Sequence, residues 1–88
     1  MPRPAFVYLL RCADASLYCG WTFEPERRLA AHRAGRGARY TRSRLPVTMA
    51  ALLVLSDATG ARREEARIKR LSRREKLALI ADDYEVVS

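Results

Sequence analysis

With 88 residues, the chain is long enough for one compact hydrophobic core and too short for two independent domains. Hydrophobic residues make up 49% of the sequence and charged residues 31%, with no apolar run long enough to span a bilayer, which excludes an integral membrane protein. The 17 Lys and Arg against 10 Asp and Glu give a formal net charge of +7, which favours a polyanionic partner.

Two cysteines, Cys12 and Cys19, and one histidine leave too few soft ligands for a structural zinc site. If the two cysteines lie on adjoining strands at opposite parity, their side chains point to opposite faces, which argues against a disulfide. No extended apolar segment follows the N-terminal residues, so nothing marks the chain for secretion. We therefore expect a soluble protein with reduced thiols in the cytoplasm.

The first elements are two short β-prone runs, Ala5 to Arg11 and Leu17 to Trp21, joined by a small polar connector. This pattern predicts a β-hairpin. If its turn centres near Asp14, residue 8 lies opposite residue 20, and residue 10 lies opposite residue 18.

In this register Tyr8 and Tyr18 share one face, roughly 7 Å apart, so both hydroxyls can reach one small ligand. Gly20 lies opposite Tyr8 and leaves space over its hydroxyl. The other face is a plausible core side, formed by Val7, Leu9, Leu17, Cys19 and Trp21. Tyrosines are also good β-formers with wet hydroxyls, so the pair alone does not identify a site.

A helix is predicted over residues 25–34, because Pro25 between two glutamates suits its first turn and Gly35 suits its end. Arg28 and His32 stand four residues apart on one face of this helix. An arginine can hold phosphate oxygens, and a histidine can exchange a proton with a reacting oxygen. A lone surface histidine is also often incidental, and spacing does not decide between the two.

The stretch up to Arg44 is predicted to be a loop, and it carries five arginines from Arg33 onward with no acid. Residues 62–76 carry eight bases against three acids. Both segments are candidate surfaces for a polyanion. The alternative is a solubilising surface, although such surfaces normally intersperse the two signs.

Residues 47–55 form a nearly unbroken apolar run that suits a buried strand or a short buried helix, and we predict a strand. Asp57 or Thr59 can then cap a helix that reaches about Arg70. Ser72 and Glu75 form a capping-box pattern that opens a third helix. The buried face of this helix is expected to carry Leu77, Ile80 and Tyr84, and residues 82–88 form an acidic, frayed tail.

One carboxylate lies on the apolar stripe of the second long helix. The stripe consists of Ala61, Glu65, Ile68 and Leu71. A buried carboxylate needs a partner. A hard divalent cation is one, because Mg²⁺ takes oxygen ligands and keeps several waters when it binds one carboxylate and a substrate phosphate. An arginine is the other, and Glu64 competes with Glu65 for the role.

The elements follow the order β-β-α-β-α-α, which predicts a single α/β (α+β) domain over residues 1–88, with a small sheet covered by helices. Taken together, these positions resemble the GIY-YIG nuclease superfamily, named for two short strand motifs that each carry a tyrosine. Here the motifs read Phe6-Val7-Tyr8 and Tyr18-Cys19-Gly20.

The resemblance extends to three further positions. In the family an arginine follows the second tyrosine by ten residues, which is Arg28 here, and a histidine or tyrosine follows four later, which is His32. The metal-binding glutamate of the family sits on a later helix, and Glu65 matches it better than Glu64. The segments 35–42 and 68–72 look like the small single-domain bacterial branch of the family, whose members mostly lack an assigned role.

The resemblance implies a central three-stranded antiparallel sheet flanked by helices, and a nuclease mechanism. One Mg²⁺ or Mn²⁺ on Glu65 would polarise the scissile phosphate. Tyr8, with Tyr18, would position or deprotonate the attacking water, Arg28 would stabilise developing charge, and His32 would assist proton transfer. A tyrosine base normally titrates near pH 10, so a nearby metal or arginine must lower its pKa.

The implied function is a metal-dependent endonuclease acting on DNA rather than RNA, selective for structure rather than sequence, with a role in repair or recombination. The alternative is a nucleic-acid-binding module with little or no cleavage. It is motivated by the arginine clusters and by Trp21, which stands where repair-type relatives carry a lysine. The bases expected to contact nucleic acid are Arg27, Arg33, Arg36, Arg39, Arg42, Arg44 and Lys69.

Overall fold

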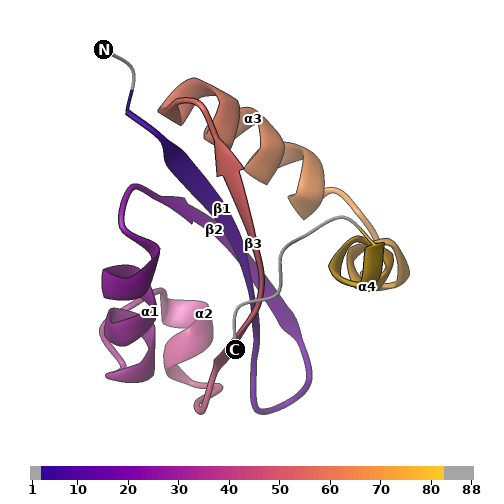
Figure 1. Cartoon of the computed structure of the whole chain (residues 1–88). Coiled ribbons are helices and arrows are strands. Elements are labelled where there is room, and N and C mark those ends of the chain that lie inside the picture. Colours follow the sequence, from indigo (N-terminus) through magenta and orange to yellow (C-terminus); the bar gives the residue numbers. More distant parts are fainter. Residues whose placement is uncertain (1–2, 83–88) are drawn as a thin grey trace.

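A sheet of three antiparallel strands forms the centre of the computed structural model, which describes residues 3–82. The strands are β1 (Ala5–Arg11), β2 (Leu17–Thr22) and β3 (Thr48–Leu55), arranged in the order β2-β1-β3. The helices are α1 (Pro25–Arg33), α2 (Arg39–Arg42), α3 (Ala58–Lys69) and α4 (Arg73–Asp82). Figure 1 shows α1 and α2 together on one side of the sheet and α3 with α4 on the other. The predicted three-stranded antiparallel sheet flanked by helices is confirmed.

The hairpin of β1 and β2 has the predicted register, with Tyr8 opposite Gly20 and Leu10 opposite Tyr18. Because side chains alternate along a strand, this register sends Tyr8 and Tyr18 to one face and Val7 to the other. The edge strand β2 therefore presents a tyrosine on the face covered by α1, next to the central strand.

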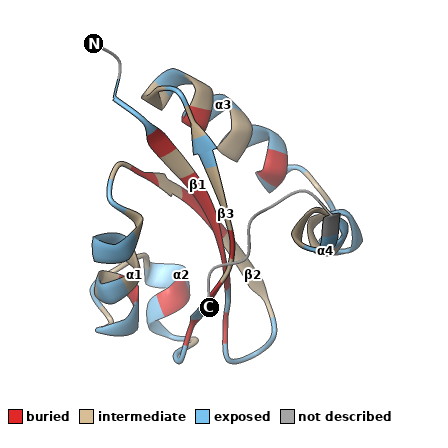
Figure 2. Cartoon of the chain, in the orientation of Figure 1, coloured by how far each residue is buried: buried red, intermediate tan, exposed pale blue. Residues whose placement is uncertain are grey.

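Each face of the sheet has its own apolar core. On the side of α3 the buried residues are Ala5, Val7, Leu9, Cys19, Ala51, Ala61 and Ile68. On the side of α1 they are Tyr8, Leu10, Cys12, Val47 and Met49. The two cysteines are both free and buried, and they lie in different cores, as their parity predicts. Figure 2 shows the buried residues running along β1, while both helical layers turn exposed residues outward.

Helix α2 corrects the sequence prediction, because it lies inside the arginine-rich stretch that was expected to be a loop. Its single turn has no amphipathic period that a sequence pattern could reveal. Thr41 is fully buried within it, and its hydroxyl donates to the carbonyl oxygen of Ala38 at 3.0 Å. Tertiary contacts of this threonine, rather than helix propensity, hold the turn in place.

The predicted helix caps are confirmed. The Asp57 carboxylate accepts from the Gly60 N–H at 2.8 Å at the start of α3. At the start of α4, Glu75 accepts from the Ser72 N–H at 3.0 Å and Ser72 Oγ accepts from the Glu75 N–H at 3.1 Å. Tyr84 and most of the predicted acidic tail, residues 83–88, lie outside the described residues. Within residues 3–82 no helix combines the length and apolar character needed to cross a membrane.

Candidate active site

Two tyrosines from the hairpin form the centre of the site. The ring centroids of Tyr8 and Tyr18 are 6.4 Å apart, close to the separation expected from their diagonal positions. Tyr8 is 1% exposed, whereas Tyr18 is only half-buried. A Cβ atom at Gly20 would lie 2.5 Å from the Tyr8 hydroxyl oxygen, so only glycine lets this hydroxyl pass over β2.

A directed chain of hydrogen bonds leads from Tyr8 into α2. The Tyr8 hydroxyl lies 2.9 Å from His32 Nε2, and His32 Nδ1 lies 2.8 Å from Thr41 Oγ1. The Thr41 hydroxyl donates its only proton to the Ala38 carbonyl oxygen, so in its contact with His32 it must be the acceptor. His32 Nδ1 therefore carries the proton, and Nε2 accepts the proton of Tyr8.

The environment sets the charge state of both partners. Burial lowers the pKa of His32 below its ordinary value, and the Arg28 guanidinium lowers it further. Burial also raises the pKa of Tyr8 well above its ordinary value, helped by Tyr18 and opposed by Arg28. The sequence interpretation required a metal or an arginine to lower the pKa of Tyr8; Arg28 does lower it, but burial outweighs Arg28. Both groups are neutral at pH 7, which matches the hydrogen-bond direction.

His32 is also not the surface residue considered from the sequence, since it is 1% exposed. A Cβ atom at Gly37 would collide with its imidazole ring, so the chain after α1 approaches the ring as closely as a glycine allows. Thr41 could not be recognised from the sequence as a partner of His32. It stands nine residues after His32, among arginines, and neither feature indicates a contact. A polar residue beside the histidine could be located only after α2 was known to pack against α1.

Arg28 stands at the opening of the site. It is exposed, and it lines a shallow depression of about 310 Å³ together with Thr22, Glu24, Arg27 and Ala31. Its guanidinium influences the pKa values of both Tyr8 and His32, which places it beside the two hydrogen-bonded groups. A phosphate in this depression would meet a fixed cation next to the tyrosines.

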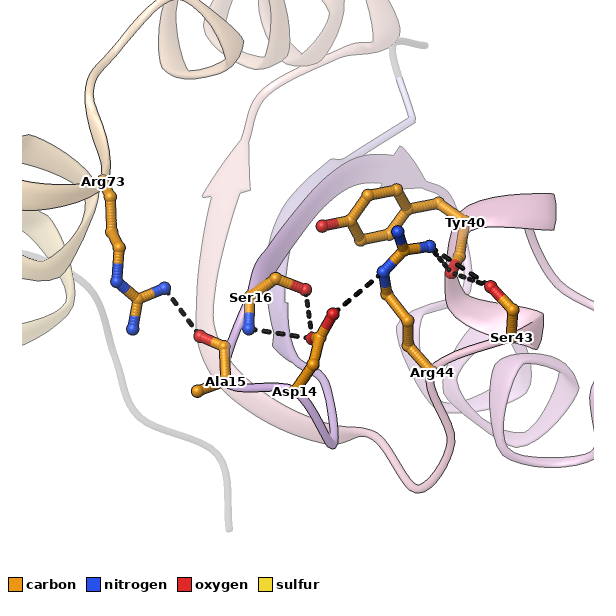
Figure 3. A network of polar contacts seen from close by, with 7 residues as sticks. All are labelled: Asp14, Ala15, Ser16, Tyr40, Ser43, Arg44 and Arg73. Carbon is orange, nitrogen blue, oxygen red and sulfur yellow. Dashed lines mark hydrogen bonds and ion pairs between the residues drawn. The ribbon is translucent and has the colours of Figure 1, made fainter.

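A second network holds the outer edge of the site (Figure 3). The Tyr40 ring stacks on Tyr18, with centroids 5.9 Å apart, and Arg44 lies over Tyr40 with its Cζ 3.8 Å from the ring centroid. Arg44 Nε donates to Asp14 in the hairpin turn at 3.0 Å, and Asp14 also accepts from the N–H of Ser16. Asp14, Arg44 and Tyr40 thereby fix the position of Tyr18.

The seven bases expected to contact nucleic acid do not form one surface. Five are exposed on α1, on α2 and between these helices: Arg27, Arg33, Arg36, Arg39 and Arg42. Arg44 is half-buried and engaged by Asp14 and Tyr40. Lys69 lies on α3, across the sheet from the tyrosines. The expected contact surface on the side of the tyrosines is thus reduced to the first five.

Glu65 lies apart from the tyrosine cluster. Its side chain is 21% exposed, and its Oε2 atom is 3.7 Å from Lys69 Nζ, so the protein cation beside it is a lysine and not the arginine considered as one alternative. It also helps to raise the pKa of the Cys19 thiol, after burial, to about 12. Cys19 faces α3, whereas its neighbour Tyr18 faces α1. Among the described residues, no hydrogen bond or ion pair joins Glu65 to the tyrosines, Arg28 or His32.

The acidic and soft side chains of the described residues limit how a metal ion could be bound. Residues 3–82 contain no group of three or more His, Cys, Asp or Glu side chains able to hold a metal ion. This excludes a cage of protein ligands within that range. A single half-buried carboxylate at Glu65 fits Mg²⁺ or Mn²⁺, because such an ion completes its coordination with waters and substrate phosphate oxygens.

Comparison with known proteins decides the family. A model described as the GIY-YIG catalytic domain matches residues 4–78, which include both tyrosine motifs and Glu65. The chain belongs to the GIY-YIG family. The resemblance inferred from the hairpin motifs is therefore confirmed. GIY-YIG membership indicates a nuclease-type function, and nucleases of this family generally use divalent metals.

The relatives of this GIY-YIG protein carry the designation UPF0213, which names no activity. A UPF0213 protein of Syntrophus aciditrophicus is 46% identical over 91% of this chain and 93% of its own length. A UPF0213 protein of Natronomonas pharaonis is 46% identical over 94% of this chain and 98% of its own length. The solution NMR structure of a UPF0213 protein from Bacillus halodurans superimposes with a TM-score of 0.61 at 39% identity, covering 91% of this chain and 85% of that one. An E. faecalis protein matches equally well, with a TM-score of 0.61 at 36% identity over 97% and 94% of the two chains.

Proposed function

We propose that this GIY-YIG protein is an endonuclease that hydrolyses phosphodiester bonds in DNA with the help of Mg²⁺ or Mn²⁺. The observation that carries the proposal is the hydrogen bond from Tyr8 to neutral His32, beside Tyr18 and the exposed Arg28. The net charge of +7 supports a nucleic-acid substrate. We further propose selection by structure rather than sequence, and a cytoplasmic role in repair or recombination.

The pKa values suggest how a water could be activated. A tyrosinate at Tyr8 is strongly disfavoured, because burial raises the pKa of this hydroxyl. His32 can instead act as the final proton acceptor, since its Nε2 lone pair faces the Tyr8 hydroxyl. The attacking water passes a proton to the Tyr8 oxygen while the Tyr8 proton moves to Nε2. No tyrosinate accumulates along this path, and the resulting imidazolium stays bonded to Thr41.

Arg28 and Tyr18 act on the phosphate side of the reaction. The exposed guanidinium of Arg28 holds non-bridging oxygens and stabilises the charge that builds on them in the transition state. The half-buried Tyr18, held by Tyr40, orients the water with its hydroxyl. Glu65 would hold the divalent cation, which when bound would polarise the scissile phosphate and supply charge for the leaving oxygen.

A second function is favoured by one observation. Glu65 is paired with Lys69 and lies on the α3 side of the sheet, away from Tyr8 and His32. A protein that kept the fold and the basic surface without assembling the metal site would bind nucleic acid and cut it poorly. This alternative predicts binding that weakens steeply with salt and no metal-dependent cleavage.

The decisive experiment is cleavage of labelled duplex, flap and single-stranded DNA and of RNA, with Mg²⁺, with Mn²⁺ or with a chelator. We expect metal-dependent cutting of DNA that falls at least about a hundredfold in Tyr8→Phe and in Glu65→Gln. Glu64→Gln is the matched control, since it neutralises the adjacent carboxylate and should retain most activity. Cutting that survives both Tyr8→Phe and Glu65→Gln would contradict the proposed site, and binding without cutting under every metal condition would favour the alternative.

A further inference from the structure

Beside the site, at the end of β2, lies a second open cavity of about 360 Å³, within the size range of small-ligand sites. Its lining residues are Arg3, Trp21, Thr22, Phe23, Glu24 and Arg28. It shares Thr22, Glu24 and Arg28 with the depression that Arg28 lines on α1. A ligand that occupied both would therefore pass directly over Arg28.

The walls of this cavity combine aromatic rings with positive charge. Trp21 and Phe23 meet edge to face with centroids 5.2 Å apart, and both are only half-buried. Arg3 places its Cζ 4.4 Å from the Phe23 centroid, and Arg62 on α3 places its Cζ 5.5 Å from the Trp21 centroid. Together with Arg28, three guanidinium groups surround two partly exposed aromatic side chains.

This combination fits one class of ligand better than others. Sites for single-stranded nucleic acid join a positive groove, which follows the backbone, to aromatic rings on which bases stack. A paired base in a duplex already stacks on its neighbours and can offer this cavity only its phosphates. The single acid in the lining, Glu24, lies 3.8 Å from Arg27, so a phosphate is expected on the side of Arg3 and Arg28.

We propose that this cavity binds an unpaired nucleobase of the strand whose phosphate lies at Arg28, with the base against Trp21 and Phe23. The cavity selects single-stranded or flapped segments over continuous duplex. This inference rests on the proposed nuclease function, because it assumes a nucleic-acid strand at Arg28. It gives Trp21 a function in base binding, whereas the sequence indicated only that Trp21 stands where repair-type relatives carry a lysine.

The chain contains one tryptophan, so intrinsic fluorescence reports on this cavity directly. The experiment titrates wild-type protein, in chelator and without metal, with a short oligothymidylate, with oligouridylate and with a blunt duplex of equal length. Fluorescence anisotropy of labelled strands measures binding in parallel. We expect saturable quenching of Trp21 by both single strands, and duplex binding with little quenching. Equal quenching by duplex and single strand, or single-strand binding without quenching, would overturn the proposal.

Variants separate stacking from charge. Trp21→Leu keeps an apolar side chain against the core but removes the indole, and we expect it to weaken oligothymidylate binding by about tenfold with little effect on duplex binding. Arg3→Ala should lower the preference for oligothymidylate over duplex. Arg70→Ala is an equal loss of charge at an exposed position directly after α3, and it should affect the binding of both ligands alike. Circular dichroism verifies that each variant folds.

The two hypotheses fail differently in these measurements. If the protein binds no nucleic acid at all, the proposed function fails and this inference fails with it. If duplex is bound and cut while Trp21→Leu leaves the preference for single strands unchanged, only the base-binding cavity is refuted.

Discussion

The Tyr8 hydroxyl lies 2.9 Å from His32 Nε2, so a residue of the central strand and a residue of α1 share one buried hydrogen bond. Thr41 orients this pair from the far side, because its hydroxyl accepts from His32 Nδ1 and donates to Ala38. The imidazole is thereby held in one tautomer, with its free lone pair directed at the tyrosine. The chemistry of the site depends on this arrangement at least as much as on the tyrosines themselves.

Thr41→Val should disturb that tautomer without touching Tyr8. The substitution leaves the His32 Nδ1 proton without a partner inside the core, while the Ala38 carbonyl still accepts from the Arg42 N–H. It should cost about 1–3 kcal/mol in the free energy of unfolding. Chemical denaturation measures the cost, and long-range proton–nitrogen NMR of the one histidine reads the tautomer directly. Thr41→Ser keeps the hydroxyl and should retain the Nδ1–H form. An Nε2–H tautomer in the wild-type protein would refute the hydrogen-bond direction.

The pKa shifts predict a stability profile with two limbs. The folded pKa of His32 is lowered, so the unfolded chain binds the extra proton first, and stability is lost as pH falls from about 6.5 through the folded pKa. The folded pKa of Tyr8 is raised, so its contribution is complete below about pH 10 and is lost as pH rises above it. Cys19, whose pKa is raised to about 12, also loses its contribution to stability as pH rises, and this loss begins at a lower pH than that of Tyr8.

Thermal unfolding across pH tests these limbs separately. His32→Gln should flatten the acid limb between its lowered pKa and about pH 6.5, and Tyr8→Phe should flatten part of the alkaline limb. Cleavage by the wild-type enzyme should also fall as His32 becomes protonated, because Nε2 then no longer accepts a proton. A wild-type profile that stays flat between pH 5 and 7, roughly the range over which a histidine titrates, would contradict the inferred state of His32.

Gly20→Ala should be strongly destabilising although it adds one methyl group. The new Cβ would lie 2.5 Å from the Tyr8 oxygen, and neither β2 nor the packed ring can yield without disturbing the hydrogen bond to His32. We expect a loss of about 1–3 kcal/mol by denaturant unfolding. Gly60→Ala, in α3, is the matched control, because its Cβ meets only ordinary contacts and should stabilise the helix by about 0.5–1 kcal/mol.

Arg44 and Arg36 should behave oppositely, although both were expected to contact nucleic acid. Arg44→Ala removes the Asp14 ion pair and the cover over Tyr40, and should lower the melting temperature and loosen Tyr18. Arg36→Ala changes an exposed side chain, and should leave the melting temperature unchanged while reducing the salt slope of DNA binding by about one. The prediction fails if Arg44→Ala melts like the wild-type protein.

The accurate predictions concern features that local sequence determines, and the missed ones depend on tertiary contacts. The hairpin register followed from residue alternation and a turn near Asp14, both of which are local properties of the sequence. The caps at Asp57 and Ser72 were equally local. The turn of α2 was missed because tertiary contacts at Thr41 hold it, and one isolated turn leaves no periodic trace. Glu65 was correctly expected to lie partly buried on α3, but sequence spacing could not tell that Lys69 would pair with it.

By itself, the sequence determined the order of the strands and the three longer helices, the shared face of Tyr8 and Tyr18, the basic character and the GIY-YIG family. These properties depend on alternation, helix signals and composition, which act over a few residues or over the whole chain. Only the tertiary structure decided that His32 is buried against Tyr8, that Thr41 fixes which nitrogen of His32 carries the proton, and that Arg3, Trp21 and Arg28 line one open cavity. Those relationships join residues far apart in the chain, and their pKa values follow from burial that exists only once the layers have packed.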